Sequence, residues 1–234
     1  MTSEAREHPR AEADVLSLDE SRRLIGYLGL ILPYGLYVLA GLRPTTGLKD
    51  LRVLQSVSAY YYTGAVALFT GVLVALSLFL WSYKGYKDVS ADRIVGKIAG
   101  AAAACVALFP STFLPALEPS WWRPWMGKAH YAAAVVLFLS FIVFALWLFR
   151  MTAQVDRSAR PRDKKVRDTI CLVCGITMIG AMIWAVLAAQ ADGSIFWAEA
   201  LAIQAFAVSW LAKGEAHKPY VRAARRMFGR SDTA

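Results

Sequence analysis

Six apolar stretches dominate the pattern of hydrophobic and polar positions along this chain. They run roughly over Arg22 to Leu42, Tyr61 to Ser82, Ile94 to Phe109, His130 to Phe149, Asp168 to Ala189 and Ile195 to Ala212. Each is close to the roughly 20 residues that cross about 30 Å of hydrocarbon as a helix. The pattern therefore predicts an all-α polytopic membrane protein with six transmembrane helices.

Basic residues lie unevenly in the polar segments between these stretches. Of the 26 lysines and arginines, 21 fall in alternate segments, beginning with the one that precedes the first stretch. Short loops rich in Lys and Arg stay on the cytoplasmic side of a membrane. Both termini are therefore predicted to be cytoplasmic. The protein itself is predicted to lie in the inner membrane of a bacterial cell.

The composition of the chain agrees with this class of protein, and the apolar stretches divide the chain into three regions. Hydrophobic residues make up 57% of the 234 residues and charged residues only 18%, which is more apolar than ordinary globular usage. We expect a cytoplasmic tail over 1–21, a transmembrane domain over 22–213 and a basic cytoplasmic tail over 214–234. Ser17 and Glu20 have the spacing of a capping box at the start of a helix.

The formal charge of +9 is explained by the basic cytoplasmic segments and needs no nucleic acid. Such segments attract anionic lipid headgroups at the cytoplasmic face. Membrane lipids are therefore the expected partners. The residues expected to contact these headgroups lie in the segment around Arg157 to Arg167 and in the tail around Arg222, Arg225 and Arg226.

Small residues recur along the third stretch, where Gly96, Gly100 and Ala104 are four residues apart. This spacing lets two helix backbones approach closely. One interpretation is the seam of a homo-oligomer, and the other is a central helix packed inside a single bundle. Cys171 and Cys174 form a C-x-x-C pair near the cytoplasmic end of the fifth stretch, where packing residues and a redox pair are the two interpretations.

Polar residues gather near the predicted outer ends of several helices, where groups at membrane depth usually mark a cavity or a pathway. The candidate ligand-binding residues are His130, Glu199, Ser56, Ser58, Tyr61, Tyr62 and Asp192. Gln204 lies deeper, and Pro33 interrupts the first stretch.

A histidine and a carboxylate at matching depth permit three interpretations. They form a hydrogen-bonded structural pair, they bind a ligand or lipid headgroup, or they perform acid–base catalysis. A zinc site needs three or more protein ligands, and the other histidines, His8 and His217, are predicted to be cytoplasmic. No metal or cofactor is therefore expected.

The order of three segments resembles that of uncharacterised bacterial six-span proteins. These segments are SVSAYYYTGAVALFTG, a third helix ending in LFPS, and AHYAAAVVLF at the start of the fourth helix. More distantly the chain is similar to the DRAM and GPI-remodelling (Frag-like) membrane proteins, over about Gln55 to Phe149. The resemblance implies Ser58, Phe109, Pro110 and His130 as shared positions, although Ala107 stands where that family has a glycine. Ceramidase-like hydrolases are a poorer comparison, because they carry paired histidines in their last helix and this chain has none there.

The sequence thus predicts an outer-facing polar pocket that binds or senses a lipid or a small amphiphile. A membrane-embedded hydrolase or transferase acting on a lipid headgroup is the alternative, with His130 as base and Glu199 as its partner. A secondary transporter is the third hypothesis, although such proteins usually carry polar groups at the midplane.

Overall fold

The computed structural model describes residues 17–42, 53–85, 90–112, 120–151 and 162–214. The regular secondary structure of this part of the chain is entirely helical, which confirms the all-α prediction. Its elements are α1 (Leu18–Leu42), η1 (Ser58–Tyr62), α2 (Val66–Ser82), α3 (Ser90–Leu108), α4 (Pro124–Leu146), η3 (Leu148–Arg150), α5 (Arg162–Gln190) and α6 (Phe196–Lys213), where η denotes a 3-10 helix.

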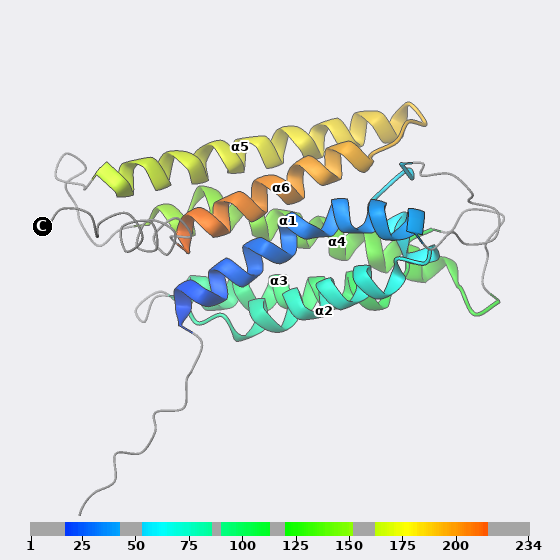
Figure 1. Ribbon diagram of the computed structural model, residues 1–234, viewed down its shortest axis with the longest axis horizontal. Coiled ribbons are helices and arrows are strands. Elements are labelled where there is room, and N and C mark those ends of the chain that lie inside the picture. Colours follow the sequence, from blue (N-terminus) through cyan, green and yellow to red (C-terminus); the bar gives the residue numbers. More distant parts are fainter. Residues whose placement is uncertain (1–16, 43–52, 86–89, 113–119, 152–161, 215–234) are drawn as a thin grey trace, which may run out of the picture.

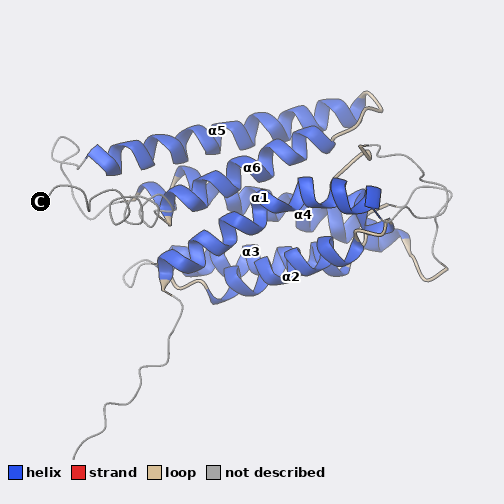
Figure 2. Ribbon diagram, in the orientation of Figure 1, coloured by secondary structure: helices blue, strands red, loops and turns tan. Residues whose placement is uncertain are grey.

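The six α-helices form a ring in chain order. Each packs against the next, and α6 packs against α1 and also reaches across to α4. Figure 1 shows them running roughly along the long axis of the molecule, with α5 at the edge beside α6, and Figure 2 shows a short turn joining α5 to α6. We call the end that carries η1 and the α5–α6 turn the η1 end. The opposite end, where α1 begins and α6 ends, is the terminal end.

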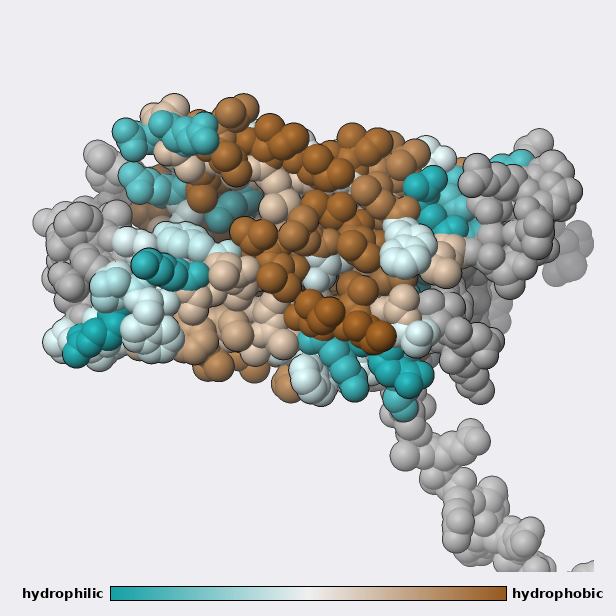
Figure 3. All heavy atoms as spheres, turned by 180° about the vertical axis from the view of Figure 1, so that it is seen from behind, coloured by the Kyte–Doolittle hydropathy of each residue, from teal (hydrophilic) through white to brown (hydrophobic). Residues whose placement is uncertain are grey.

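Three helical segments are long and apolar enough to cross a membrane, namely Leu18–Leu42, Pro124–Arg150 and Lys164–Gln190. A fourth apolar helix, Val66–Ser82, has 17 residues and would reach about 26 Å at about 1.5 Å per residue. Figure 3 shows hydrophobic residues gathered over the middle of one face and hydrophilic residues toward both ends. This distribution is the one expected of a protein that lies in a bilayer.

The outward faces of all six helices carry large apolar side chains. Ile31 of α1, Leu78 of α2, Ile98 of α3, Leu139 of α4, Ile183 of α5 and Val208 of α6 are each between 42% and 66% exposed. A helix on the surface of a water-soluble protein presents polar residues on that face. Such faces are suited to hydrocarbon rather than to water.

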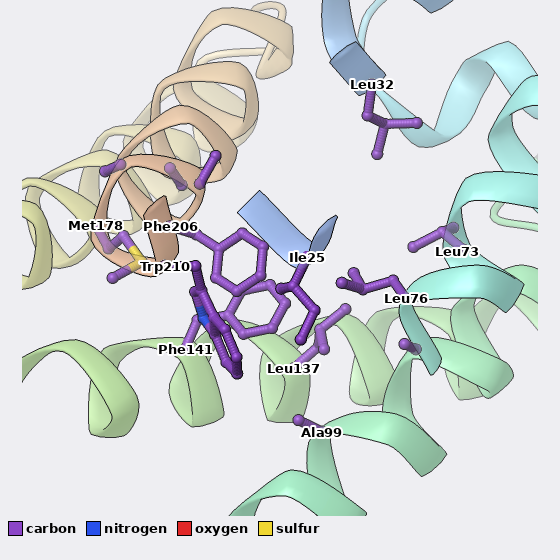
Figure 4. Close-up of a cluster of buried hydrophobic side chains, with 14 of the residues drawn as sticks. Ile25, Leu32, Leu73, Leu76, Ala99, Leu137, Phe141, Met178, Phe206 and Trp210 are labelled. Carbon is purple, nitrogen blue, oxygen red and sulfur yellow. The ribbon is translucent and has the colours of Figure 1, made fainter. Parts of the chain in front are cut away.

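The interior is a continuous core to which every helix contributes. Figure 4 shows Ile25, Leu73, Leu76, Leu137, Phe141 and Phe206 converging between the helices, with Trp210 beside the two phenylalanines. The rings of Phe141 and Phe206 stack with centroids 3.7 Å apart. Toward the terminal end, Trp210 packs against Tyr83, Phe144 and Phe149.

The small residues of α3 pack inside the bundle. A Cβ atom on Gly100 would lie 2.9 Å from the Ser77 carbonyl oxygen of α2, and one on Gly96 would lie 2.9 Å from the Leu80 carbonyl oxygen. The Ser77 hydroxyl also donates to the Gly100 carbonyl at 2.8 Å. Gly96 and Gly100 therefore pack closely against α2 of the same chain.

Pro33 and Gln204 have a shared structural role. Proline has no N–H, so Pro33 leaves the Gly29 carbonyl, four residues earlier, without its intrahelical donor. The Gln204 amide of α6 donates to the Leu30 carbonyl at 3.2 Å and approaches the Gly29 carbonyl at 3.5 Å. Helix α1 continues through Pro33, and α6 places a hydrogen-bond donor beside the carbonyl that the proline leaves unpaired.

Helix boundaries differ from the predicted ones at several places. Helix α1 begins at Leu18, inside the predicted tail, and the Ser17–Glu20 capping box is confirmed by reciprocal hydrogen bonds of 2.9 and 3.2 Å. Helix α2 begins at Val66 rather than Tyr61, because η1 comes before it. Helix α5 begins at Arg162, before the apolar stretch.

Three polar or aromatic residues near the terminal end face the interior instead of the surface. Trp210 is fully buried, and Asp92 is 2% exposed. Lys213 is buried and donates to the Phe149 carbonyl at 2.7 Å. Hydropathy indicates the depth of a residue and not the face of the helix on which it lies.

Candidate polar-ended cavity

A cavity of about 60 Å³ lies inside the ring, among residues of α1, η1, α2, α3, α4 and α6. Its wall is mainly apolar, with Leu32, Leu73, Leu137, Phe141 and Phe206 among the lining side chains. Its polar side chains are Ser58, His130 and Glu199. The structure therefore brings together three of the seven candidate residues, from η1, α4 and α6.

Glu199 lies in the first turn of α6 and holds the chain before η1. Its Oε2 atom accepts a hydrogen bond from the Val57 N–H at 2.6 Å. Nearby, the Ile195 N–H donates to the Gln55 carbonyl at 2.7 Å, and the Ser194 hydroxyl donates to the Leu54 and Gln55 carbonyls. These bonds fix Ser58 relative to the start of α6, although more than 130 residues separate the two segments.

His130 lies in the second turn of α4 and is only 2% exposed. Its Nδ1 atom lies 2.7 Å from the Phe109 carbonyl oxygen, which belongs to the unpaired C-terminal end of α3. A carbonyl oxygen can only accept, so Nδ1 carries the proton and donates. In the neutral ring, Nε2 is then an acceptor.

Ser56 stands behind Ser58 and does not line the cavity. The two hydroxyl oxygens are 3.1 Å apart, and the Ser56 hydroxyl also accepts from the Ala59 N–H at 3.0 Å. Ser56 therefore orients the Ser58 hydroxyl and supports the first turn of η1.

The two candidate tyrosines do not line the cavity. The Tyr61 ring packs edge-on against Tyr62 and Phe69. The Tyr62 hydroxyl donates to the Ser111 carbonyl at 2.7 Å, and that carbonyl also accepts from the Trp122 indole at 3.2 Å. Burial raises the pKa of the Tyr62 hydroxyl to about 12, so it remains a protonated donor at neutral pH.

Asp192 lies in the α5–α6 turn, outside the cavity. It is exposed, and its φ of 52° is a left-handed backbone conformation that aspartate tolerates better than most residues. The predicted depth of Asp192 in the membrane therefore did not indicate whether its side chain lines the cavity.

His130 and Glu199 do not form the hydrogen-bonded pair that was one interpretation of the sequence. Within the described residues each side chain binds a different backbone group, the Phe109 carbonyl for His130 and the Val57 N–H for Glu199. The same part of the chain holds no group of three or more His, Cys, Asp or Glu residues suited to a metal ion. Cys171 and Cys174 are both buried free thiols.

The sequence did not predict which residues close the cavity on the side of Trp210. Phe141 and Phe206 line the cavity and stack on each other, closing it toward the Trp210 cluster. Their aromatic character was visible in the sequence, but an apolar residue on an apolar helix carries no signal of the face it occupies.

Comparison of the chain with protein-family models, curated proteins and solved structures finds no match. The resemblance to six-span bacterial proteins and to the Frag-like group therefore stays a prediction. Of its implied positions, Ser58 and His130 line the cavity, and Phe109 supplies the carbonyl that holds His130.

Proposed function

We propose that the protein spans the bacterial inner membrane six times, with the terminal end in the cytoplasm and the η1 end on the outer side. The apolar outward faces of all six helices support this arrangement. So does the placement of 21 of 26 basic residues in alternate segments. Most residues of the two predicted tails, 1–16 and 215–234, lie outside the described residues, as does the segment 152–161.

We propose further that the cavity binds a lipid or a small amphiphile. The observation that carries this proposal is the placement of Ser58, His130 and Glu199 in a cavity whose other walls are apolar. Mixed lining of this kind is typical of small-molecule sites, where a few polar groups orient a mainly apolar ligand.

The size of the cavity limits what enters it. A volume of about 60 Å³ is well below the roughly 300–1,000 Å³ of sites that enclose a drug-sized ligand. One end of a slender amphiphile therefore suits the cavity, whereas a whole phospholipid does not.

A membrane-embedded hydrolase or transferase is the second candidate. The contact between His130 Nδ1 and the Phe109 carbonyl favours it, because it orients the ring and leaves Nε2 able to accept a proton. Glu199 and Ser58 line the same cavity and would share in such chemistry.

Secondary transport is less well supported. The Phe141–Phe206 stack and the Trp210 cluster fill the bundle below the cavity. Of the two midplane features that favoured a carrier, Gln204 donates to backbone carbonyls of α1 just before Pro33, the other feature.

Native mass spectrometry of the purified protein with lipid identification tests the binding proposal. We expect one defined amphiphile to remain with the wild type and to be lost from His130→Asn and Glu199→Gln. The asparagine amide can still donate to the Phe109 carbonyl, and the glutamine oxygen can still accept from the Val57 N–H, so both variants keep the structural bond. Asp192→Asn, at the exposed turn, is the matched control and should retain the amphiphile.

An identical set of bound lipids in all four proteins would contradict the binding proposal. For the enzyme, turnover of the identified lipid should disappear in His130→Asn while binding of that lipid remains.

A further inference from the structure

The polar groups of the cavity define the kind of ligand that it can accept. Among the described residues that line it there is no lysine or arginine, and the charged or ionisable groups are His130 and Glu199. A buried anion needs a cation or several hydrogen-bond donors to replace its water. The cavity offers an anionic headgroup neither a cation nor several hydrogen-bond donors.

His130 contributes an acceptor. Its Nδ1 proton is donated to the Phe109 carbonyl at 2.7 Å. A carbonyl oxygen supplies no proton, so this contact does not satisfy the lone pair of Nε2. A ligand group that donates a hydrogen bond would satisfy it.

Glu199 contributes a second acceptor. Only Oε2 is bonded, to the Val57 N–H at 2.6 Å, and no described residue donates to Oε1. The Ser58 hydroxyl, paired with Ser56 at 3.1 Å, can donate or accept. Two acceptors and one adaptable hydroxyl therefore face a cavity with an otherwise apolar wall.

We infer that the ligand is an amphiphile whose polar end is a hydrogen-bond donor, a primary amine or a hydroxyl on an alkyl chain. This inference rests on the proposed function of the same cavity. A donor head would bind Glu199 and His130 together, and an ammonium would also gain a charge-assisted bond to the carboxylate. Phosphate and carboxylate heads would meet two acceptors and at most one donor, the Ser58 hydroxyl, and are excluded.

The test uses four probes with the same six-carbon chain: hexylamine, hexanol, hexanoate and hexyl phosphate. Their affinities are measured on the full-length protein in phosphatidylcholine nanodiscs, from the shift of the thermal unfolding midpoint with probe concentration. We expect hexylamine and hexanol to bind the wild type, and hexanoate and hexyl phosphate to produce no more shift than they do with Glu199→Ala.

Glu199→Gln should weaken hexylamine binding about tenfold relative to hexanol, a change that corresponds to about 1.4 kcal/mol. Because this variant keeps the acceptor for the Val57 N–H, it separates ligand recognition from folding. His130→Asn should weaken both donor probes and leave their ratio unchanged.

The outcomes separate the two proposals. Equal or tighter binding of hexyl phosphate or hexanoate would overturn the donor-head inference and leave an amphiphile site in place. A shift that is the same in wild type, His130→Asn and Glu199→Gln for all four probes would overturn the binding function itself, since the probes would then act only through the bilayer.

Discussion

At the scale of single residues, the two oxygens of Glu199 have different surroundings. Oε2 caps the start of η1 through the Val57 N–H, whereas Oε1 has no donor among the described residues. The fold therefore requires an acceptor at this position and not a charge. Ligand binding is the role for which the carboxylate itself would be needed.

Glu199→Ala should lower the free energy of unfolding by about 1–3 kcal/mol, because it leaves the amide of buried Val57 without an acceptor. Glu199→Gln should keep most of that stability. Thermal unfolding of both variants in the same detergent measures the difference. An equal loss in the two variants would mean that the charge, and not the cap, stabilises this end.

The polar residues also show how far sequence reasoning reaches at this scale. Hydropathy and the helix ends placed His130, Glu199 and Ser58 at one depth, and they do line one cavity. Asp192 has the same predicted depth but is exposed in a turn. The direction of a side chain depends on which neighbour packs against each helix, and the weak periodicity of lipid-facing helices does not indicate it.

At the scale of helices, the contact between α2 and α3 depends on glycine. Gly100→Ala would place a Cβ 2.9 Å from the Ser77 carbonyl oxygen and from the Trp81 nitrogen, both backbone atoms that cannot rotate away. We expect a loss of about 1–3 kcal/mol in unfolding free energy. Gly71→Ala on α2 is the matched control, since nothing lies within 4 Å of its added Cβ. A smaller loss at Gly100 than at Gly71 would contradict the close packing.

The repair of α1 by Gln204 predicts a coupling between two helices. Gln204→Leu should cost about 1–3 kcal/mol, because backbone carbonyls of α1 lose their donor. In a Pro33→Ala background the restored amide N–H would satisfy Gly29, so the same change should cost less. A double-mutant cycle by thermal unfolding measures this coupling, expected at about 0.5–2 kcal/mol. Additive effects would show that Gln204 does not compensate for Pro33.

The existence of all six helices could be predicted from hydropathy, but several of their ends could not. Helix α5 continues to Arg162 through charged residues that a hydropathy pattern assigns to a loop. The 3-10 turn at Ser58–Tyr62 replaces the predicted first residues of α2. The segment before η1 is held by the long-range bond between the Val57 N–H and Glu199. The first turns of α5 carry a local ion pair between Lys164 and Asp168 at 3.4 Å, and hydropathy reports neither contact.

At the scale of the whole molecule, the two ends of the bundle should face opposite sides of the membrane. A chain with Cys105, Cys171 and Cys174 replaced by alanine gives a background without thiols. In intact cells an impermeant maleimide should label Asp192→Cys, and it should label Lys84→Cys only after permeabilisation; both positions are exposed. Labelling of both without permeabilisation would contradict the proposed topology.

The central claim is that an amphiphile enters the cavity within the ring rather than coating its outside. The most direct measurement is photolabelling in native membranes with an alkanol that carries a diazirine on its chain, followed by mapping of the modified peptides. We predict adducts on α4 between His130 and Phe141 and on α6 between Glu199 and Phe206, removed by excess unlabelled alkanol. Adducts confined to outward-facing positions such as Ile176 and Ile183 of α5, and unaffected by competitor, would contradict it.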